Sequence, residues 1–326
     1  MGDIDTESKK YISDNTHFAD IFNYLIYDGE PVIDPDALYP LDTTEIVVPY
    51  GNDAREPEQR YRDVLKQWQV MTDGEAIYAV LGSEIQAKVH YAMPVKDMLY
   101  DSMHYAKQVE EAKRSYRNQK EKKKRVRLTG REFLSGFRKS DKLMPVITLA
   151  IYLGASEWDG PMSIHEMLST KNRKLLRFVQ EYRIHLIAPG QMEDEEFLKF
   201  KTDFGKVLHY IKYSKDKEKL YDLTHQGDRF RNIDPDSANL INVVTGSELQ
   251  LEARGGKIDM CKAIDDMRQE SRQEGFLEAL AGLVQKGLLP LADAAKEAGL
   301  SPDEFQTMAI NVSSLEKCLF RSCAHF

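Results

Sequence analysis

The sequence has little cysteine, no long apolar segment and no excess of positive charge. Its three cysteines, Cys261, Cys318 and Cys323, are odd in number and suit a reducing compartment better than a disulfide framework. The longest apolar run, residues 144–155, is too short to cross a bilayer and is typical of a buried strand. Residues 1–10 are polar and lack the apolar core of a signal peptide. These absences predict a cytoplasmic protein without membrane contact.

The overall charge limits how the chain could bind nucleic acid. The formal net charge is −8 over 326 residues, so any such binding would depend on a local basic patch. The densest basic stretch is residues 113–127. Two interpretations of it stay open. It could contact a DNA backbone as a loop beside the site, or it could be a solvated helix end.

Hydrophobic periodicity predicts an α/β protein with helices on both sides of a sheet. Apolar residues at helical intervals predict a first helix over residues 17–30, and Pro94 opens a long helix over 94–119. The sequence contains no internal repeat and no low-complexity linker. The remaining expected elements are strands over 61–70, 76–86, 142–154 and 182–190, a short helix over 163–169 and a charge-rich helical stretch over 193–226.

The C-terminal part differs in composition from the rest. From about residue 258 the chain is amphipathic and helical, and two short helices flank a turn at which Ser301 is the expected N-cap. This pair resembles a helix-turn-helix, but Asp303 and Glu304 place acidic groups on the second helix, where a helix that binds in a DNA groove needs cations. A hairpin that packs or pairs subunits is an equal alternative, which leaves a homo-oligomer open. The terminal Cys318, Cys323 and His325 give fewer ligands than a zinc site needs.

Two polar residues end the apolar strand expected over 76–86. Side chains alternate along a strand, so Glu84 and Gln86 project from the same face, just before a helix, where α/β proteins bind ligands. A carboxylate there can hold a hard divalent cation, but phosphodiester hydrolysis needs a second carboxylate nearby. Asp63 is the nearest candidate. The alternative is that these residues only mark where the strand reaches solvent. Weaker acidic candidates are Glu45, Asp53, Glu56 and Glu58.

Several longer strings resemble one protein family. Asp63 followed by Glu84-x-Gln86 on a strand and then a helix resembles the PD-(D/E)xK nuclease core. More narrowly, the chain resembles the bacterial family of recombination-promoting nucleases and related transposase-like proteins. The strings that carry this resemblance cover most of residues 13–275, and the most specific are "GSEIQAKVHYAMPVKDMLYDSMHYAKQVEE" and "PVITLAIYLGASEWDGP".

The resemblance implies a restriction-endonuclease-like fold and Mg²⁺-dependent DNA cleavage, with Mn²⁺ as a possible substitute. By match of motif, Asp63 and Glu84 are the metal-binding carboxylates and Gln86 stands where the motif has lysine. An amide can orient a water or a phosphate oxygen by hydrogen bonds, but it supplies no positive charge. The missing cation could come from Lys88 or Lys96, which are near in sequence.

Together these observations give one expectation for the whole chain. Residues 10–235 are expected to form the nuclease-like α/β domain, and residues 236–326 a helical C-terminal region. The expected function is a metal-dependent DNA endonuclease linked to recombination or mobile elements. The rival is a catalytically degenerate nuclease fold that binds nucleic acid or acts in assembly. His90, His104 and His165 are interpreted as packed or surface residues rather than ligands.

Overall fold

The computed structural model describes residues 2–47, 58–61, 63–72, 75–121 and 129–307. The strands are β1 (Leu38–Pro40), β2 (Thr44–Val47), β3 (Glu58–Tyr61), β4 (Val64–Thr72), β5 (Glu75–Gln86), β6 (Val146–Tyr152), β7 (His185–Ile187), β8 (Ala253–Arg254) and β9 (Lys257–Ile258). The α-helices are α1 (Gly2–Ser13), α2 (Asn15–Tyr27), α3 (Met93–Glu121), α4 (Gly130–Ser135), α5 (Ile164–Met167), α6 (Arg173–Leu176), α7 (Phe204–Tyr213), α8 (Lys217–His225), α9 (Pro235–Thr245), α10 (Met260–Gln285) and α11 (Leu291–Glu297). Short 3-10 helices are η1 (Pro35–Ala37), η2 (Pro189–Gln191) and η3 (Glu196–Leu198).

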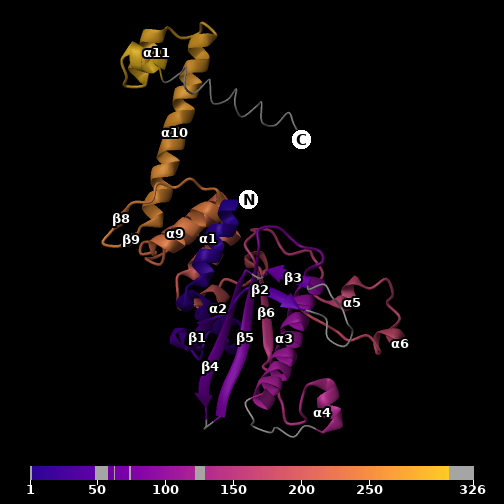
Figure 1. The fold of residues 1–326 in the computed structure, drawn as a ribbon. Helices are drawn as coiled ribbons and strands as arrows, with labels where there is room; N and C mark the ends of the chain where they lie inside the picture. Colours follow the sequence, from indigo (N-terminus) through magenta and orange to yellow (C-terminus); the bar gives the residue numbers. More distant parts are fainter. Residues whose placement is uncertain (1, 48–57, 62, 73–74, 122–128, 308–326) are drawn as a thin grey trace. The chain divides into compact units, whose positions relative to one another are not determined.

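A five-stranded mixed sheet lies at the centre of the first of two compact units, in the order β1-β4-β5-β6-β7 (Figure 1). Strand β4 runs antiparallel to its neighbours β1 and β5, whereas β6 runs parallel to β5 and β7 parallel to β6. Parallel neighbours need a crossover connection, and α3 lies in the segment that joins β5 to β6. The expectation of an α/β protein is therefore confirmed at this level.

Helices cover both faces of this sheet. On one face, Met93 at the start of α3 packs against Ala150 and Tyr152 of β6. On the other face, the ring of Tyr27 in α2 meets that of Trp68 in β4 edge-on, with centroids 6.3 Å apart. The apolar sequence of β6 fits its position, because its side chains are buried along almost its whole length, on both faces of the sheet.

Further helices complete the first unit, which comprises residues 1–229 and 233–248. Helix α1 packs against α9, and α9 packs against α7. The hydroxyl of Tyr11 lies 2.6 Å from that of Ser237 in this buried layer. The sequence patterns did not predict α1, because it is mostly polar and buries only its C-terminal residues.

Three expected strands have different boundaries in the structure. The strand expected over 61–70 is β4, which begins at Val64 and extends to Thr72. The strand expected over 142–154 is β6, which is confined to Val146–Tyr152. The strand expected over 182–190 is reduced to β7, because Pro189 starts a 3-10 helix and residues 182–184 hydrogen-bond to residues 162–164. The expected long helix and the strand over β5 are confirmed.

The second unit, residues 230–232 and 249–326, is mostly helical within its described part. Asp259 caps α10 by accepting a hydrogen bond from the backbone N–H of Lys262. Leu280 of α10, Ala294 of α11 and Phe305 form a small apolar core. Ser301 is the expected N-cap, since its hydroxyl accepts a hydrogen bond from the Glu304 N–H and the Glu304 carboxylate accepts one from the Ser301 N–H. No helix in the described part of either unit is long and apolar enough to span a membrane.

Candidate functional site

The β4–β5 hairpin brings Asp63 and Glu84 together. Its last register pair is Val64 opposite Ser83, so continuing the antiparallel register places Asp63 opposite Glu84. The Asp63 carboxylate also accepts a hydrogen bond from the backbone N–H of Ile85, at 2.7 Å from Oδ2. This bond fixes the position of Asp63 beside the end of β5. The two carboxylates that the sequence singled out therefore belong to one place in the fold.

Glu84 is a buried carboxylate with a lysine partner. Its relative exposure is 1%, and its Oε2 lies 2.7 Å from Nζ of Lys96 in the first turn of α3. Burial alone would lower the pKa of Lys96, but the nearby charge of Glu84, with a contribution from Asp63, raises it above its usual value. Lys96 is therefore protonated at neutral pH, and its ammonium group is attracted electrostatically by both carboxylates.

A second lysine reaches Asp63 from α1. Nζ of Lys9 lies 2.9 Å from Oδ1 of Asp63 and 2.9 Å from Oδ2 of Asp5. Burial would lower the pKa of Lys9, but the hydrogen bonds to Asp5 and Asp63 raise it. The sequence analysis missed Lys9. No local pattern relates it to Asp63, because the contact depends on how α1 packs beside the sheet.

Gln86 lies two residues beyond Glu84 on the same strand face. It is paired in register with Tyr152 of β6, and its carbonyl accepts a hydrogen bond from the backbone N–H of Leu153. Its side chain is only partly buried, in contrast to that of Glu84. Gln86 thus lies at the C-terminal end of β5, on the same face of the strand as Glu84.

The chemistry of these groups is compatible with Mg²⁺. Asp63 and Glu84 offer carboxylate oxygens, and Mg²⁺ in proteins is commonly bound by one or two carboxylates together with waters and substrate phosphates. Within the described ranges, no three His, Cys, Asp or Glu side chains form a cluster suited to a metal. Both carboxylates here are balanced by lysines, so a cation would compete with two ammonium groups.

The other sequence candidates are not brought to this site by the described residues. Asp53 and Glu56 lie outside the described ranges, as do Cys318, Cys323, His325 and residues 122–127 of the basic stretch. Only the backbones of Glu45 and Glu58 are described, in the separate β2–β3 pair. Lys88 is exposed.

The three histidines hold the kinds of position expected for them. His90 is exposed and His104 is buried. His165 lies between the carboxylate of Glu181 and the backbone carbonyl of Val179, each 2.9 Å from a ring nitrogen.

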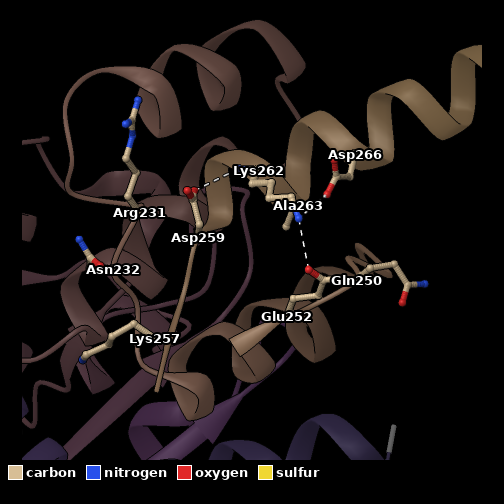
Figure 2. A pocket seen from close by; sticks show the side chains of 9 residues that line it. All are labelled: Arg231, Asn232, Gln250, Glu252, Lys257, Asp259, Lys262, Ala263 and Asp266. Atoms are coloured by element: carbon tan, nitrogen blue, oxygen red, sulfur yellow. Dashed lines mark hydrogen bonds and ion pairs between the residues drawn. The ribbon is translucent and has the colours of Figure 1, made fainter. Parts of the chain in front are cut away.

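A separate polar pocket of about 190 Å³ lies within the second unit (Figure 2). Lys262 lies between Glu252 and Asp266, at 3.2 and 3.6 Å. The lining contains as many acidic as basic side chains, so it favours neither sign of ligand. The lining residues are Arg231, Asn232, Gln250, Glu252, Lys257, Asp259, Lys262, Ala263 and Asp266.

The fold and site thus define a mixed α/β protein in which two carboxylates and two lysines meet at the ends of two adjacent strands. Comparisons with protein-family models, with curated proteins and with solved structures found no significant match to this chain.

Proposed function

We propose that the protein is a Mg²⁺-dependent DNA endonuclease with a restriction-endonuclease-like core, linked to recombination or mobile elements. The observation that carries this proposal is the convergence of Asp63 and Glu84 on adjacent strands beside the cationic Lys96. Two carboxylates and one ammonium group at a strand end match the charge pattern that phosphodiester hydrolysis needs. The choice of DNA as the substrate and the link to recombination or mobile elements rest on the family resemblance.

The chemistry of each side chain suggests a separate role for it in the reaction. A bound Mg²⁺ would activate water and offset charge developing on the phosphate. Asp63 and Glu84 would hold it. Lys96 would place a positive charge near the reacting phosphate, which Gln86 cannot do. Gln86 would orient the attacking water or a phosphate oxygen by hydrogen bonds, because it is partly exposed and lies on the same strand face as Glu84.

Incubation of the purified chain with plasmid and linear DNA, with and without Mg²⁺, tests this proposal. We expect cleavage only with Mg²⁺, and none from Asp63→Asn or Glu84→Gln, which keep the side-chain shapes. Lys217→Gln, at an exposed position of α8, is the control and should cleave as the wild type does. Cleavage by the two carboxylate variants at the wild-type rate would reject the site.

A non-cleaving nucleic-acid-binding or assembly protein is the second candidate. It is favoured by the ion pairs of Lys9 and Lys96, which already balance both carboxylates without a metal. Calorimetric titration with Mg²⁺ or Mn²⁺ separates the candidates. A nuclease should give a binding signal that Glu84→Ala removes, whereas a degenerate fold should give the same trace for both proteins.

A further inference from the structure

A basic arm projects from the first unit between β6 and β7. We define the basic arm as residues 165–181, which include α6. Its base is a short antiparallel stem in which the Ile164 N–H donates to the Tyr182 carbonyl and the Ile184 N–H donates to the Met162 carbonyl, each at 3.0 Å. Ile184 is buried in the core beside β6. The arm is therefore held outward by a fixed stem.

The composition of the basic arm is unusual for a chain with net negative charge. It has four Lys and Arg residues, all between residues 167 and 180, and its two acidic residues, Glu166 and Glu181, lie at its base. All four are exposed, and none forms an ion pair with a described residue. They are Lys171, Arg173, Lys174 and Arg177.

Large apolar side chains are exposed among these cations. Phe178 is 86% exposed and Leu175 is 55% exposed. A cluster of exposed apolar groups on a soluble surface commonly marks a binding site. Here the cations and apolar groups are interspersed along residues 171–179, so the complementary partner carries both negative charge and flat apolar surface. Nucleic acid has this combination, since phosphates bind Lys and Arg and bases stack on aromatic rings.

An anionic membrane surface fits the basic arm less well. An interfacial helix needs segregated polar and apolar faces over several turns. Helix α6 has only four residues, and Asn172 caps it immediately before Arg173.

Helix α3 links the basic arm to the candidate site. Lys96 of α3 contacts Glu84, and Asp101, farther along α3, accepts a hydrogen bond from the Tyr182 hydroxyl of the stem at 2.7 Å. Met93 at the start of α3 packs in the same apolar cluster as Ile184 of the stem. The base of the basic arm is therefore fixed to the same helix that supplies the cation at the end of β5.

We infer that the basic arm is a DNA-contacting element, in which the exposed cations bind backbone phosphates and Phe178 stacks on an unpaired or splayed base. The inference rests on the proposed DNA substrate, but it concerns binding and not cleavage. It can therefore be measured in EDTA, where the candidate metal site plays no part.

Fluorescence anisotropy of the full chain with labelled duplex and single-stranded DNA tests the inference. The charge variant is Arg173→Gln/Lys174→Gln/Arg177→Gln, and Lys215→Gln/Lys217→Gln, at exposed positions elsewhere in the first unit, is its control. If all three cations bind phosphates, the slope of log K against log salt should fall by about 2.7 for duplex DNA. Phe178→Ala should weaken single-strand binding by about fivefold to hundredfold. Because the Phe178 side chain is 86% exposed, Phe178→Ala should fold as the wild type does, so a loss of single-strand binding reports on the contact with DNA.

The outcomes separate the arm from the nuclease proposal. Arm variants with the affinity and salt slope of the control would overturn the inference, whatever the cleavage assay shows. Arm variants that lose binding only to phosphatidylserine vesicles would overturn it in favour of a membrane contact. If Asp63→Asn keeps both binding and cleavage, the proposed nuclease site fails while the arm still stands.

Discussion

Removing the Lys96 ammonium should make Glu84 a destabilising charge. Glu84 is 1% exposed and its carboxylate lies 2.7 Å from Nζ of Lys96, so Lys96→Met leaves a buried carboxylate without this cation. Breaking a buried ion pair by deleting one partner costs about 3–5 kcal/mol of unfolding free energy. The Lys96 side chain is 29% exposed, so water screens the pair partly and we expect the lower end, about 3 kcal/mol.

Urea unfolding followed by circular dichroism measures this loss. With a slope of about 1–3 kcal/mol per molar urea, the midpoint should fall by about 1 M or more. Lys113→Met is the matched control, since Lys113 lies on the same helix at 3.4 Å from Glu110, whose carboxylate is 34% exposed and stays hydrated without the lysine, so the change should cost less than about 1 kcal/mol. The double variant Lys96→Met/Glu84→Gln removes both charges of this pair and should recover most of the lost stability.

The loss should also depend on pH. In Lys96→Met, the buried carboxylate of Glu84 lacks its cation, and burial penalises only the charged form of a carboxyl. The deficit should therefore be smaller where the carboxyl can take up a proton, and should grow from pH 5 to pH 8. An unchanged midpoint for Lys96→Met, or a deficit of equal size at both pH values, would refute the reasoning.

Magnesium should partly replace the missing ammonium. At a free Mg²⁺ concentration ten times its dissociation constant, the stabilisation is about 1.4 kcal/mol. The shift should be larger in Lys96→Met than in the wild type, where the lysine competes for Glu84. If neither protein responds to Mg²⁺ while both respond to urea as expected, the two carboxylates form a structural ion pair and not a metal site.

Three further predictions concern separate groups. Gln86→Ala should slow cleavage about hundredfold without preventing metal binding. Gln86→Lys should keep or raise the cleavage rate. If Gln86→Ala cleaves as fast as the wild type, the amide has no role in the reaction. Burial lowers the pKa of His209 to about 4, whereas an unfolded histidine has a pKa of about 6.5. Between these two pH values the unfolded chain binds a proton that the folded chain does not bind. The free energy of unfolding should therefore fall by about 2–3 kcal/mol between pH 7 and pH 4. Comparison of urea midpoints for wild type and His209→Gln checks this, because the variant should lose that component. Asp20→Ala removes hydrogen bonds from the backbone N–H groups of Lys201 and Thr202 and from the Thr202 hydroxyl, and should lower the unfolding free energy by about 3 kcal/mol in the same assay.

The sequence predicted the parts of the fold that depend on local periodicity. Alternation over β5 placed Glu84 and Gln86 on one face, because strand side chains repeat every two residues. The apolar run over β6 and the cap at Ser301 are likewise local signals. The order of these elements was enough to predict an α/β protein.

The features that the sequence did not predict depend on contacts between distant segments. Lys9 reaches Asp63 only because α1 packs beside the sheet, and no spacing rule relates the two residues. Lys96 was identified only as near in sequence, while its contact with Glu84 depends on how α3 begins. The stem of the basic arm was interpreted as part of a strand, because Tyr182 and Ile184 belong to an apolar run that continues into β7.

The register of the β4–β5 hairpin limits how this protein can change in length. Asp63 meets Glu84 at the end of a ladder that starts at Thr72 opposite Glu75, so every residue between them contributes to the alignment. One inserted residue on either strand would shift the pairing and turn one carboxylate to the opposite face. Within the paired segments 64–72 and 75–83, insertions or deletions are therefore tolerated only as matched changes in both strands, whereas changes between Thr72 and Glu75 leave this register as it is. Among diverged descendants of this gene, the number of paired residues between the two carboxylates should vary by even numbers, while substitutions that keep the alternation should accumulate freely.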